Sequence, residues 1–544
     1  MNFKLFFLSL GTVLLGSFLA FYVNGFPTDG IDDANIYMVY MRNFSEGHGF
    51  VYNVGGERVE GFTSLFWTIL GAGIYHFTDS IGPVLMLINI VVITYSIYKY
   101  LLFIQENQPY GSKLTVPFQV LFASLIVVIP GFFSWTVIAL LETGIWCSVL
   151  SLLLLFVLKN TGRSKISDEI YFCSLIVILI LIRPESLLWG LFFVSARGFK
   201  VAYDTRNIRA SFYQMLPGII IYIITISILI TWRISYFGFP LPNTFYAKVS
   251  GDKLHNLLYG GFYLYKNFLH NPLLLLTALL VLINIKAISK SYLLIILTGF
   301  FGVTLFIPLY TGGDHFGMGR FIQPSLLGVY LLLVLLIFQK RQLSLKEVSA
   351  LVLFLSFTSQ NSWYESILFR SGPISHEFAL AQSGRSKSER LNKFFSYEDD
   401  GYPEIGVLTA GGSAYTYLGK TNDLLGLNNS EMAHFEEVGV SSNGPKNHSG
   451  FKQEVFFKQE PDIFFLSLEI LENDDPRLYE PLTIGEFSRE VFKSIDSNPE
   501  FENEFDAVVI SNLHLDYSIK TFASEDFLAT LDVEDYSYKK ISYK

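Results

Sequence analysis

The chain contains very little cysteine, and this scarcity excludes two kinds of site. Only two of the 544 residues are cysteines, Cys147 and Cys173, and each falls inside an apolar segment. Two thiols placed in this way supply neither a disulfide framework nor a thiolate metal site, so we interpret both as small packing residues. The chain also lacks the spacings of Walker, Rossmann and metalloprotease motifs, so a nucleotide-powered enzyme is not indicated.

Charge is scarce as well. Charged residues make up 16% of the chain against 51% hydrophobic residues, and no Lys/Arg-rich face indicates a nucleic-acid partner. Apolar runs long enough to cross about 30 Å of hydrocarbon recur from Leu5 to about Gln360. Beyond that point charged residues become frequent and apolar runs shorten to strand length. We therefore predict a polytopic α-helical membrane domain over residues 1–360 and a soluble, extracytoplasmic α/β domain over residues 361–544.

The distribution of lysine and arginine predicts how the chain crosses the membrane. These residues collect at Lys4, at Lys99 and Lys113, at Lys159, Arg163 and Lys165, at Arg197, Lys200, Arg206 and Arg209, at Lys286 and Lys290, and at Lys340, Arg341 and Lys346. Placing every cluster in the cytoplasm gives a cytoplasmic N-terminus and about eleven crossings. They lie near residues 5–23, 82–102, 116–131, 142–158, 170–183, 185–197, 213–233, 272–286, 291–309, 321–338 and 347–360.

The first of these helices is expected to be an uncleaved membrane span. The apolar segment 63–77 is expected to be a short helix at the outer interface, within a first external loop of residues 25–80. Five polar segments then share the non-cytoplasmic face: 32–63, 142–143, 183–185, 239–248 and 312–320. Folding of a hydrophobic chain does not require such groups beside a bilayer, so we interpret them as a site for a membrane-held substrate.

Asp32 and Asp33 are the leading candidates for catalysis. They begin a predicted helix whose apolar face carries Ile36, Val39, Tyr40 and Phe44. Aspartate is a preferred N-cap residue, so one of the two could serve only the helix, which leaves the second carboxylate spare. A carboxylate that is partly desolvated near lipid can have a raised pKa and act as a general base.

Other charged residues could contact a substrate. Glu142 lies at the outer end of an apolar span, where acidic residues are usually functional or paired. Arg183 and Glu185 could equally form an internal ion pair that holds helices together. Lys248 and Arg320 end loops rich in proline or glycine, and they could bring cations to an anionic group or reach lipid headgroups instead.

Several further residues have a role that the sequence leaves open. In the first loop, His48 could contact substrate or be an ordinary turn histidine, and Glu60 could bind a sugar hydroxyl. In the tail, residues 405–409, 462–467 and 507–511 predict strands with helices between them. The pair Gly411-Gly412 could bind an anion or simply form a turn.

The first loop resembles that of a known family. It contains Asp32-Asp33-Ala34, Arg42-Asn43, Glu46-Gly47-His48-Gly49, Asn53, Glu57-Arg58-Val59-Glu60-Gly61-Phe62-Thr63 and Trp67. This pattern resembles the first external loop of bacterial GT-C fold glycosyltransferases, and in particular the group that includes the mycobacterial terminal arabinofuranosyltransferase. Five later segments also resemble signatures of that group. They are Leu141-Glu142-Thr143, Arg183-Pro184-Glu185, the segment 240–248, Gly312-Gly313-Asp314 with Arg320-Phe321, and the segment 422–427 with His448.

The resemblance implies an enzyme of the bacterial cytoplasmic membrane. Such an enzyme transfers a sugar from a polyprenyl-phosphate carrier to a glycan or lipid acceptor on the external face, among membrane lipids and without nucleic acid. The expected catalytic base is an acid of the first loop, for which we favour Asp33, with Asp32 as its partner or as a helix cap. Expected contacts of the donor phosphate are Arg320, Lys248, His315 and Arg183, and expected substrate contacts are Glu142, Glu60, His48, Asn243 and Asp314. Some GT-C relatives bind a divalent metal ion and others do not, so metal dependence stays open.

Three other functions stay open from the sequence, one of which is a structural assembly protein whose C-terminal tail does the binding. A transporter or flippase of lipid-linked sugars would explain the spans and the interfacial charges without catalysis. Alternating access, however, needs a route to both faces and usually a site at the membrane midplane, whereas the polar segments gather on one face. A glycan ligase or polymerase would differ from a monosaccharide transferase only in the size of its donor.

Overall fold

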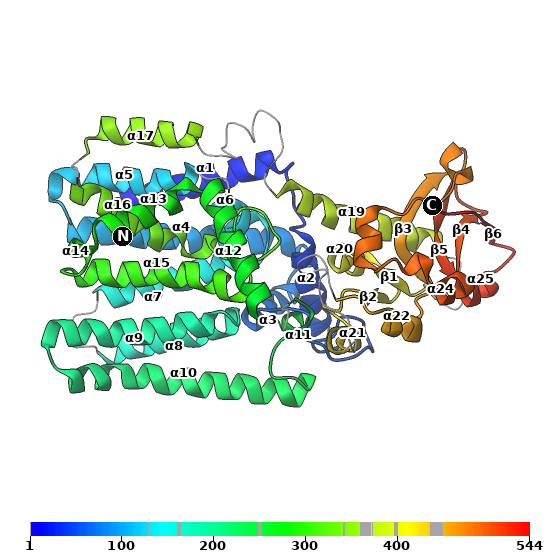
Figure 1. Cartoon of the computed structure of the whole chain (residues 1–544), viewed down its shortest axis with the longest axis horizontal. Helices are drawn as coiled ribbons and strands as arrows, with labels where there is room; N and C mark the ends of the chain where they lie inside the picture. The colour runs from blue at the N-terminus through cyan, green and yellow to red at the C-terminus, as the bar shows by residue number, and fades with distance from the viewer. Residues whose placement is uncertain are drawn as a thin grey trace.

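The protein is elongated, with a helical bundle at one end of its long axis and a β-sheet with its own helices at the other (Figure 1). The computed structural model describes residues 2–128, 131–159, 165–248, 253–340, 343–358, 372, 374–396, 401–435 and 450–544. The predicted domain boundary at residues 360 and 361 lies outside these residues.

The bundle contains a helix at each of the eleven segments predicted to cross the membrane. Its helices are α1 (Phe3–Val23), α3 (Leu65–Tyr75), α4 (Ile81–Asn107), α5 (Ser112–Val128), α6 (Gly131–Phe133), the π-helix η1 (Ser134–Ile138), α7 (Thr143–Lys159), α8 (Ile166–Ile182), α9 (Ser186–Thr205), α10 (Ile208–Phe237), α12 (Lys253–His270), α13 (Pro272–Ile283), α14 (Ile285–Ile288), α15 (Tyr292–Thr311), α16 (Leu326–Lys340) after the 3-10 turn η2 (Gln323–Ser325), and α17 (Leu345–Thr358).

Fewer than eleven of the described helices have the length and composition of a complete membrane span. Among the described residues, four helices are long and apolar enough to span a membrane: α1, α4, α10 and α15. The total is up to six if each of two bent pairs is one span, namely α5 with the segment 131–138, and α12 with α13. The expected count of eleven crossings therefore stays a prediction, while the multi-helical apolar bundle itself is present.

Local sequence signals set the ends of the helices that lead into the polar loops. The side chain of Asn207 accepts a hydrogen bond from the N–H of Ala210 and caps the start of α10. This helix ends at Gly238 and α15 ends at Gly312, both in the left-handed conformation that glycine adopts without steric cost. Each glycine turns the chain out of the bundle and into a loop predicted to carry a cation.

Short helices occupy the space between the bundle and the sheet (Figure 1). They are α2 (Asp32–Ser45), α11 (Asn243–Lys248) and α21 (Ser430–His434). The predicted apolar face of α2 is buried at Ile36, Val39 and Tyr40, whereas Phe44, near the end of the helix, is exposed. The segment predicted to be a short helix within the first external loop is α3, and whether it lies at a membrane interface stays a prediction.

The C-terminal part is a mixed α/β structure, as predicted. Its strands are β1 (Ile405–Val407), β2 (Thr421–Asp423), β3 (Ile463–Glu472), β4 (Phe505–Asn512), β5 (Tyr517–Ser524) and β6 (Tyr536–Lys540), in the sheet order β2-β1-β3-β5-β4-β6. Strands β2, β1 and β3 run parallel, and β5, β4 and β6 add antiparallel neighbours. The helices of this part are α19 (Ser375–Phe394), α20 (Ala410–Thr416), α22 (Gln453–Gln459), α23 (Glu486–Val491), α24 (Pro499–Glu504) and α25 (Glu525–Thr530).

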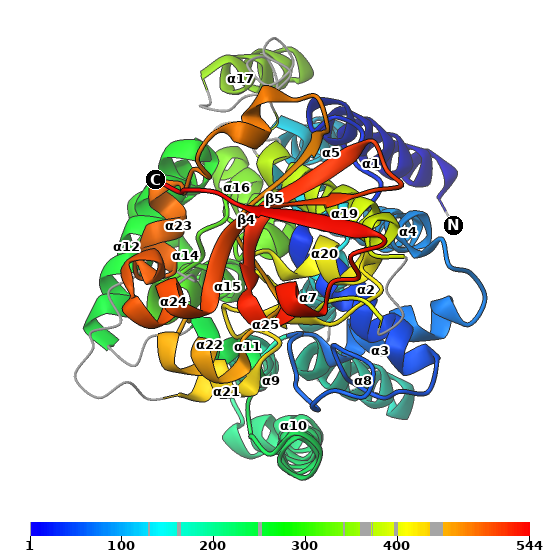
Figure 2. The ribbon, with the colours of Figure 1, turned by 90° about the vertical axis from the view of Figure 1, so that its right-hand side faces the viewer.

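The sheet does not face the bundle directly. Helices α19 and α20 lie between the sheet and the bundle in Figure 1, and they lie behind the sheet in the end-on view of Figure 2. Helix α20 packs on α2 of the first loop and on α19. At the sheet edge, the side chain of Asn53 exchanges two hydrogen bonds with the backbone of Thr421 in β2, of 2.9 and 3.1 Å. The first loop is therefore held between the bundle and the C-terminal part.

Candidate active site

A cavity of about 830 Å³ lies where the bundle meets the first loop, and all five predicted polar segments contribute to its wall. Its charged lining residues are Asp33, Glu142, Arg183, Glu185, Lys248, Lys253, Asp314 and Arg320. Most of the remaining wall is apolar and includes Leu187, Leu188, Leu241, Phe245, Leu257, Ile307 and Phe321, with Leu427 from the C-terminal part. The cavity thus combines a few charged groups with a large apolar surface.

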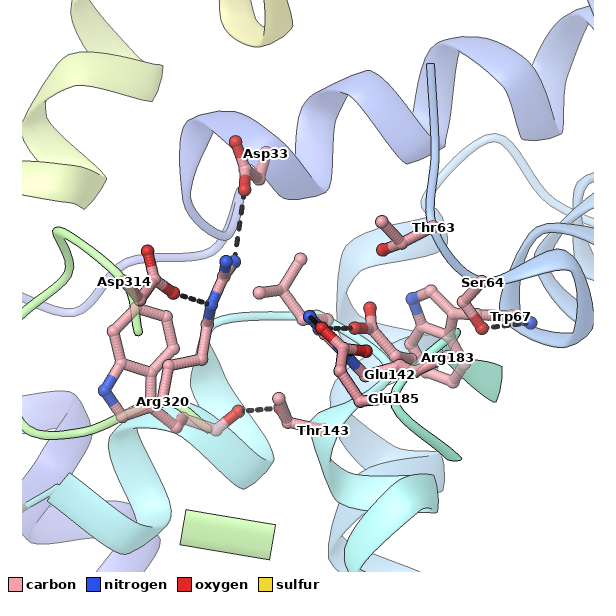
Figure 3. Close-up of polar contacts among 12 residues, drawn as sticks. Asp33, Thr63, Ser64, Trp67, Glu142, Thr143, Arg183, Glu185, Asp314 and Arg320 are labelled. Atoms are coloured by element: carbon pink, nitrogen blue, oxygen red, sulfur yellow. Dashed lines mark hydrogen bonds and ion pairs between the residues drawn. The ribbon is translucent and has the colours of Figure 1, made fainter. Parts of the chain in front are cut away.

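Arg320 lies between two carboxylates of the cavity (Figure 3). Its Nε donates to Oδ2 of Asp314 at 2.7 Å, and its Nη1 donates to Oδ2 of Asp33 at 3.1 Å. The guanidinium also lies 4.4 Å from the ring centroid of Phe316, which adds a cation–π contact. Asp33 comes from the first turn of α2, whereas Asp314 and Arg320 come from the loop between α15 and η2.

A second cation and a histidine extend this charged group. Nζ of Lys248, at the end of α11, is 3.7 Å from Oδ2 of Asp33, and Nδ1 of His315 is 3.3 Å from Oδ1 of Asp314. Burial alone would raise the pKa of both aspartates, but the neighbouring cations outweigh it. Lys248 and Arg320 hold the pKa of Asp33 below its usual value, and Arg320 with His315 holds that of Asp314 well below it.

The neighbouring aspartates have different partners. Neither is the N-cap of α2, because Ile31 occupies that position and provides no side-chain cap. The carboxylate of Asp32 instead accepts hydrogen bonds from the backbone N–H groups of Gly411 and Gly412, at 3.0 and 2.8 Å. The expectation of a desolvated carboxylate with a raised pKa is met by Asp32, whose burial raises the pKa to about 6. It is wrong for Asp33, whose adjacent cations lower the pKa.

Glu142, Arg183 and Glu185 form a buried ion-pair group in the wall of the cavity (Figure 3). Arg183 pairs with Glu142, and its Nε donates to Glu185 at 3.1 Å. The same guanidinium lies 5.2 Å from the ring centroid of Trp146 and 5.0 Å from that of Phe321. Among the residues that the structure describes, Oε2 of Glu142 is buried and accepts no hydrogen bond. The group therefore ties the helices together, and within the described part of the chain it leaves one carboxylate oxygen of Glu142 without a hydrogen bond.

Two non-glycine residues in the left-handed conformation precede key side chains of the site. Leu140 has φ of 59° and lies two residues before Glu142, and Met318 has φ of 59° and lies two residues before Arg320. Left-handed backbone costs an L-residue about 1–2 kcal/mol, and it is retained where the surrounding packing fixes it. Both side chains are buried, so the packing that holds these turns also directs Glu142 and Arg320.

Three predicted substrate contacts have other partners. Glu60 lies in a buried, bidentate ion pair with Arg233 of α10, with contacts of 2.9 to 3.2 Å. The amide of Asn243 donates to the carbonyls of Gly426 and Leu427 and so ties α11 to the C-terminal part. His48 is exposed, with Nε2 3.7 Å from Glu46. His448 lies outside the described residues.

Sequence reasoning missed several residues near the site. Lys253 and Asn256 of α12 line the cavity, yet their segment looks like an ordinary amphipathic helix. Arg233 is a charge near the end of an apolar span, and that position was a usable signal. Arg385 binds Asp29 and Asn35 of the first loop, although it lies in a stretch typical of a solvated helix. Nothing in its local sequence indicates this contact.

The described residues contain no group of three or more His, Cys, Asp or Glu side chains placed to hold a metal ion. The two cysteines are free, Cys147 buried and Cys173 partly buried, in line with their interpretation as packing residues. The two acids at the charged end of the cavity, Asp33 and Asp314, are engaged by Arg320.

No protein-family model matches the chain, and no curated protein matches it. Among solved structures, it is similar to the archaeal oligosaccharyltransferase AglB from Archaeoglobus fulgidus in complex with an inhibitory peptide and a dolichol-phosphate. The identity is 12% and the TM-score 0.49, over 98% of this chain and 76% of that chain. The apo form of the Archaeoglobus fulgidus oligosaccharyltransferase gives 13% and 0.48, over 95% and 74%. Its complex with Zn and sulfate gives 12% and 0.46, over 94% and 73%. At these identities and TM-scores, the structural similarity supports no conclusion about activity. The narrower resemblance to the group of the mycobacterial arabinofuranosyltransferase stays an expectation from the sequence.

Proposed function

We propose that the protein is a GT-C type glycosyltransferase that moves a sugar from a polyprenyl-phosphate donor to a hydroxyl group of a cell-envelope glycan or lipid on the external face of the membrane. The observation that carries this proposal is the position of Asp33. Its carboxylate faces two cations, Arg320 and Lys248, at the charged end of a cavity whose walls are otherwise mainly apolar.

The cavity suits a substrate with one anionic group, one polar group and a long apolar chain. Arg320 and Lys248 can bind a phosphate, because charge-assisted hydrogen bonds to phosphate are among the strongest in proteins. Leucine and phenylalanine side chains line much of the rest of the cavity and can hold a prenyl chain. Two buried oxygens have no hydrogen-bond partner among the described residues, namely Oε2 of Glu142 and Oγ1 of Thr244. Both can accept hydrogen bonds from sugar hydroxyl groups.

The proposed reaction follows from this arrangement. The acceptor oxygen attacks the anomeric carbon, and the bond between that carbon and the phosphate oxygen breaks. The acceptor proton passes to the carboxylate of Asp33, acting as general base. Arg320 and Lys248 stabilise the charge that develops on the departing polyprenyl phosphate, with Arg183 as a further cation in the cavity wall.

Substrate binding would also strengthen the base. Arg320 and Lys248 lower the pKa of Asp33, which keeps the carboxylate ionised but makes it a weak base. A donor phosphate would compete for the same two cations and draw them away from the carboxylate. Asp33 would then accept a proton more readily once the donor is in place, so base strength would be coupled to donor binding.

The main alternative is a transporter or flippase of lipid-linked sugars. The cavity lies at the end of the bundle beside the first loop and the C-terminal part, where α2 and α11 are seen in Figure 1, rather than midway along the helices. That position favours chemistry at one membrane face over alternating access. A ligase or polymerase stays a variant of the same proposal with a larger donor.

The test uses purified protein in lipid nanodiscs with a panel of polyprenyl-phosphate monosaccharides. We expect release of polyprenyl phosphate together with glycosylation of an acceptor, and loss of at least ~10²-fold in rate for Asp33→Asn. Asp79→Asn, an acid of the same loop in the turn before α4, is the matched control and keeps the wild-type rate. Movement of intact lipid-linked sugar between leaflets without bond cleavage, or full activity of Asp33→Asn, would reject the proposal.

A further inference from the structure

The C-terminal part holds the first turn of α2 through three side-chain contacts. Asp32 accepts the N–H groups of Gly411 and Gly412 at 3.0 and 2.8 Å. Arg385 of α19 donates from Nη1 to Asp29 at 3.0 Å and from Nε to the side chain of Asn35 at 2.6 Å. The contacts surround the start of α2: Asp29 lies before the helix, Asp32 is its first residue, and Asn35 lies in its first turn.

The packing around α20 leaves no room for a side chain at Gly411, which faces α2, or at Gly412, which faces α19. A Cβ added at Gly411 would lie 1.8 Å from the backbone oxygen of Asp32, and one added at Gly412 would lie 2.2 Å from the backbone oxygen of Ala381. Neither distance is possible without a shift of the backbone. The two glycines therefore allow α20 to approach both α2 and α19 at van der Waals distance.

We propose that Arg385 and the Gly411-Gly412 turn are positioning groups of the active site, which hold Asp32 and thereby orient Asp33 toward Arg320 and Lys248. This inference rests on the proposed function. Successive residues of an α-helix point about 100° apart, so a fixed Asp32 directs the neighbouring carboxylate to a different side. Asp32 faces the C-terminal part, and Asp33 faces the cavity.

The geometry explains why such support matters for rate. Asp33 must lie within hydrogen-bond reach of the acceptor hydroxyl, and a misplacement of about 1 Å can cost ~10²-fold. The N-cap residue Ile31 offers no side-chain hydrogen bond to fix the start of α2. The hydrogen bonds to Asp29, Asp32 and Asn35 supply this restraint from residues more than 340 positions away in the sequence.

The deciding experiment compares Arg385→Ala with Arg390→Ala. Both arginines lie on α19, but Arg390 pairs with Glu472 at the protein surface, 3.3 Å away. We expect Arg385→Ala to lower kcat about tenfold or more, while KM for the donor changes less than about twofold because the cavity cations are untouched. Arg385→Lys, which can keep one of the two contacts, should recover part of kcat. Arg390→Ala should leave both parameters unchanged.

Hydrogen exchange provides a readout that does not depend on turnover. Arg385→Ala and Gly411→Ala should both speed the exchange of amides in residues 29–36 and 410–416, with other regions as in the wild type. Wild-type kcat in Arg385→Ala, equal loss in Arg390→Ala, or a rise in donor KM without a change in kcat would overturn the inference. If instead Asp33→Asn is fully active, the proposed function itself fails, which separates the two outcomes.

Discussion

The pKa values of the adjacent residues Asp32 and Asp33 in α2 shift in opposite directions, because their partners differ in charge. Asp32 meets neutral amide groups, so the desolvation that comes with burial dominates and raises its pKa to about 6. Asp33 meets Lys248 and Arg320, whose charges outweigh its own burial. Adjacency in sequence therefore says little about function, because a helix directs neighbouring residues into different surroundings.

The pKa of Asp32 predicts the pH dependence of stability. The folded protein holds this proton more tightly than the unfolded chain does, so the associated stability is fully present below about pH 4 and is lost as the pH rises through about 6. Asp33 and Asp423 add to the effect by repulsion, and the amides of Gly411 and Gly412 oppose it. In Asp32→Asn, the fall in Tm between pH 4 and pH 6.5 should be smaller than in the wild type, measured by thermal unfolding in detergent. An unchanged fall would show that Asp32 does not titrate in this window.

The buried pair of Glu60 and Arg233 predicts a test of the role of Glu60. Arg233→Met should lower the free energy of unfolding by about 3–5 kcal/mol, because it leaves a buried carboxylate without its counter-ion. Glu60→Gln combined with Arg233→Met should restore most of that loss, and transfer per folded molecule should stay near the wild-type rate. Denaturation and activity are measured on the same samples. A double variant that is stable but inactive would show that Glu60 contacts the substrate, as the sequence predicts.

At the scale of elements, the helices could be predicted and the contacts between distant segments could not. Each of the eleven apolar segments predicted to cross the membrane contains a helix. The ends of such helices follow local signals, for example Asn207 before α10 and Gly238 after it. Strands β1, β3 and β4 were found, whereas β2, with three residues, β5 and β6 were missed because each is supported by pairing rather than by local pattern. The pair Gly411-Gly412 was recognised as able to bind an anion, but its anion is Asp32, which no local sequence could indicate.

The glycines of the loop between α15 and η2 predict how that loop presents Arg320. Gly319 has φ of 66°, and a Cβ there would lie 1.9 Å from Oδ1 of Asn267 in α12. Gly319→Ala should therefore displace the loop, raise KM for the donor several-fold and lower stability by about 1–2 kcal/mol. Gly302→Ala, in α15 with no atom within 4 Å of the added Cβ, is the matched control. Equal kinetics of the two variants would show that the loop tolerates the strain.

At the scale of the whole molecule, the ends of the helices divide into two groups. The side chain of Asn2 donates to Gln105 at 2.9 Å, and Nζ of Lys159 donates to Glu106 at 2.5 Å, which joins the start of α1 to the ends of α4 and α7. The hydroxyl of Tyr203 donates to the carbonyl of Lys290 at 3.0 Å and joins the ends of α9 and α14. The helix ends that carry Lys4, Lys159 and Lys290 thus lie at one end of the bundle, and the cavity lies at the other.

This division predicts which residues a membrane-impermeant reagent reaches. In a background with Cys147→Ala and Cys173→Ala, single cysteines are introduced as His48→Cys and Asp474→Cys at the end that carries the cavity and the sheet. Lys165→Cys and Lys290→Cys mark the opposite end, and all four positions are exposed.

If the lysine and arginine clusters lie in the cytoplasm, an impermeant maleimide added to intact cells should label only His48→Cys and Asp474→Cys. All four single-cysteine variants should react after permeabilisation. Labelling of Lys165→Cys from outside would reverse the orientation and place the cavity on the cytoplasmic face. Labelling of His48→Cys but not Asp474→Cys would separate the sheet from the first loop, against the contacts of Asn53 with Thr421. The four positions together therefore test the orientation and the shared side of both parts, because the chain must cross the membrane an odd number of times between His48 and Lys165 for the predicted pattern to appear.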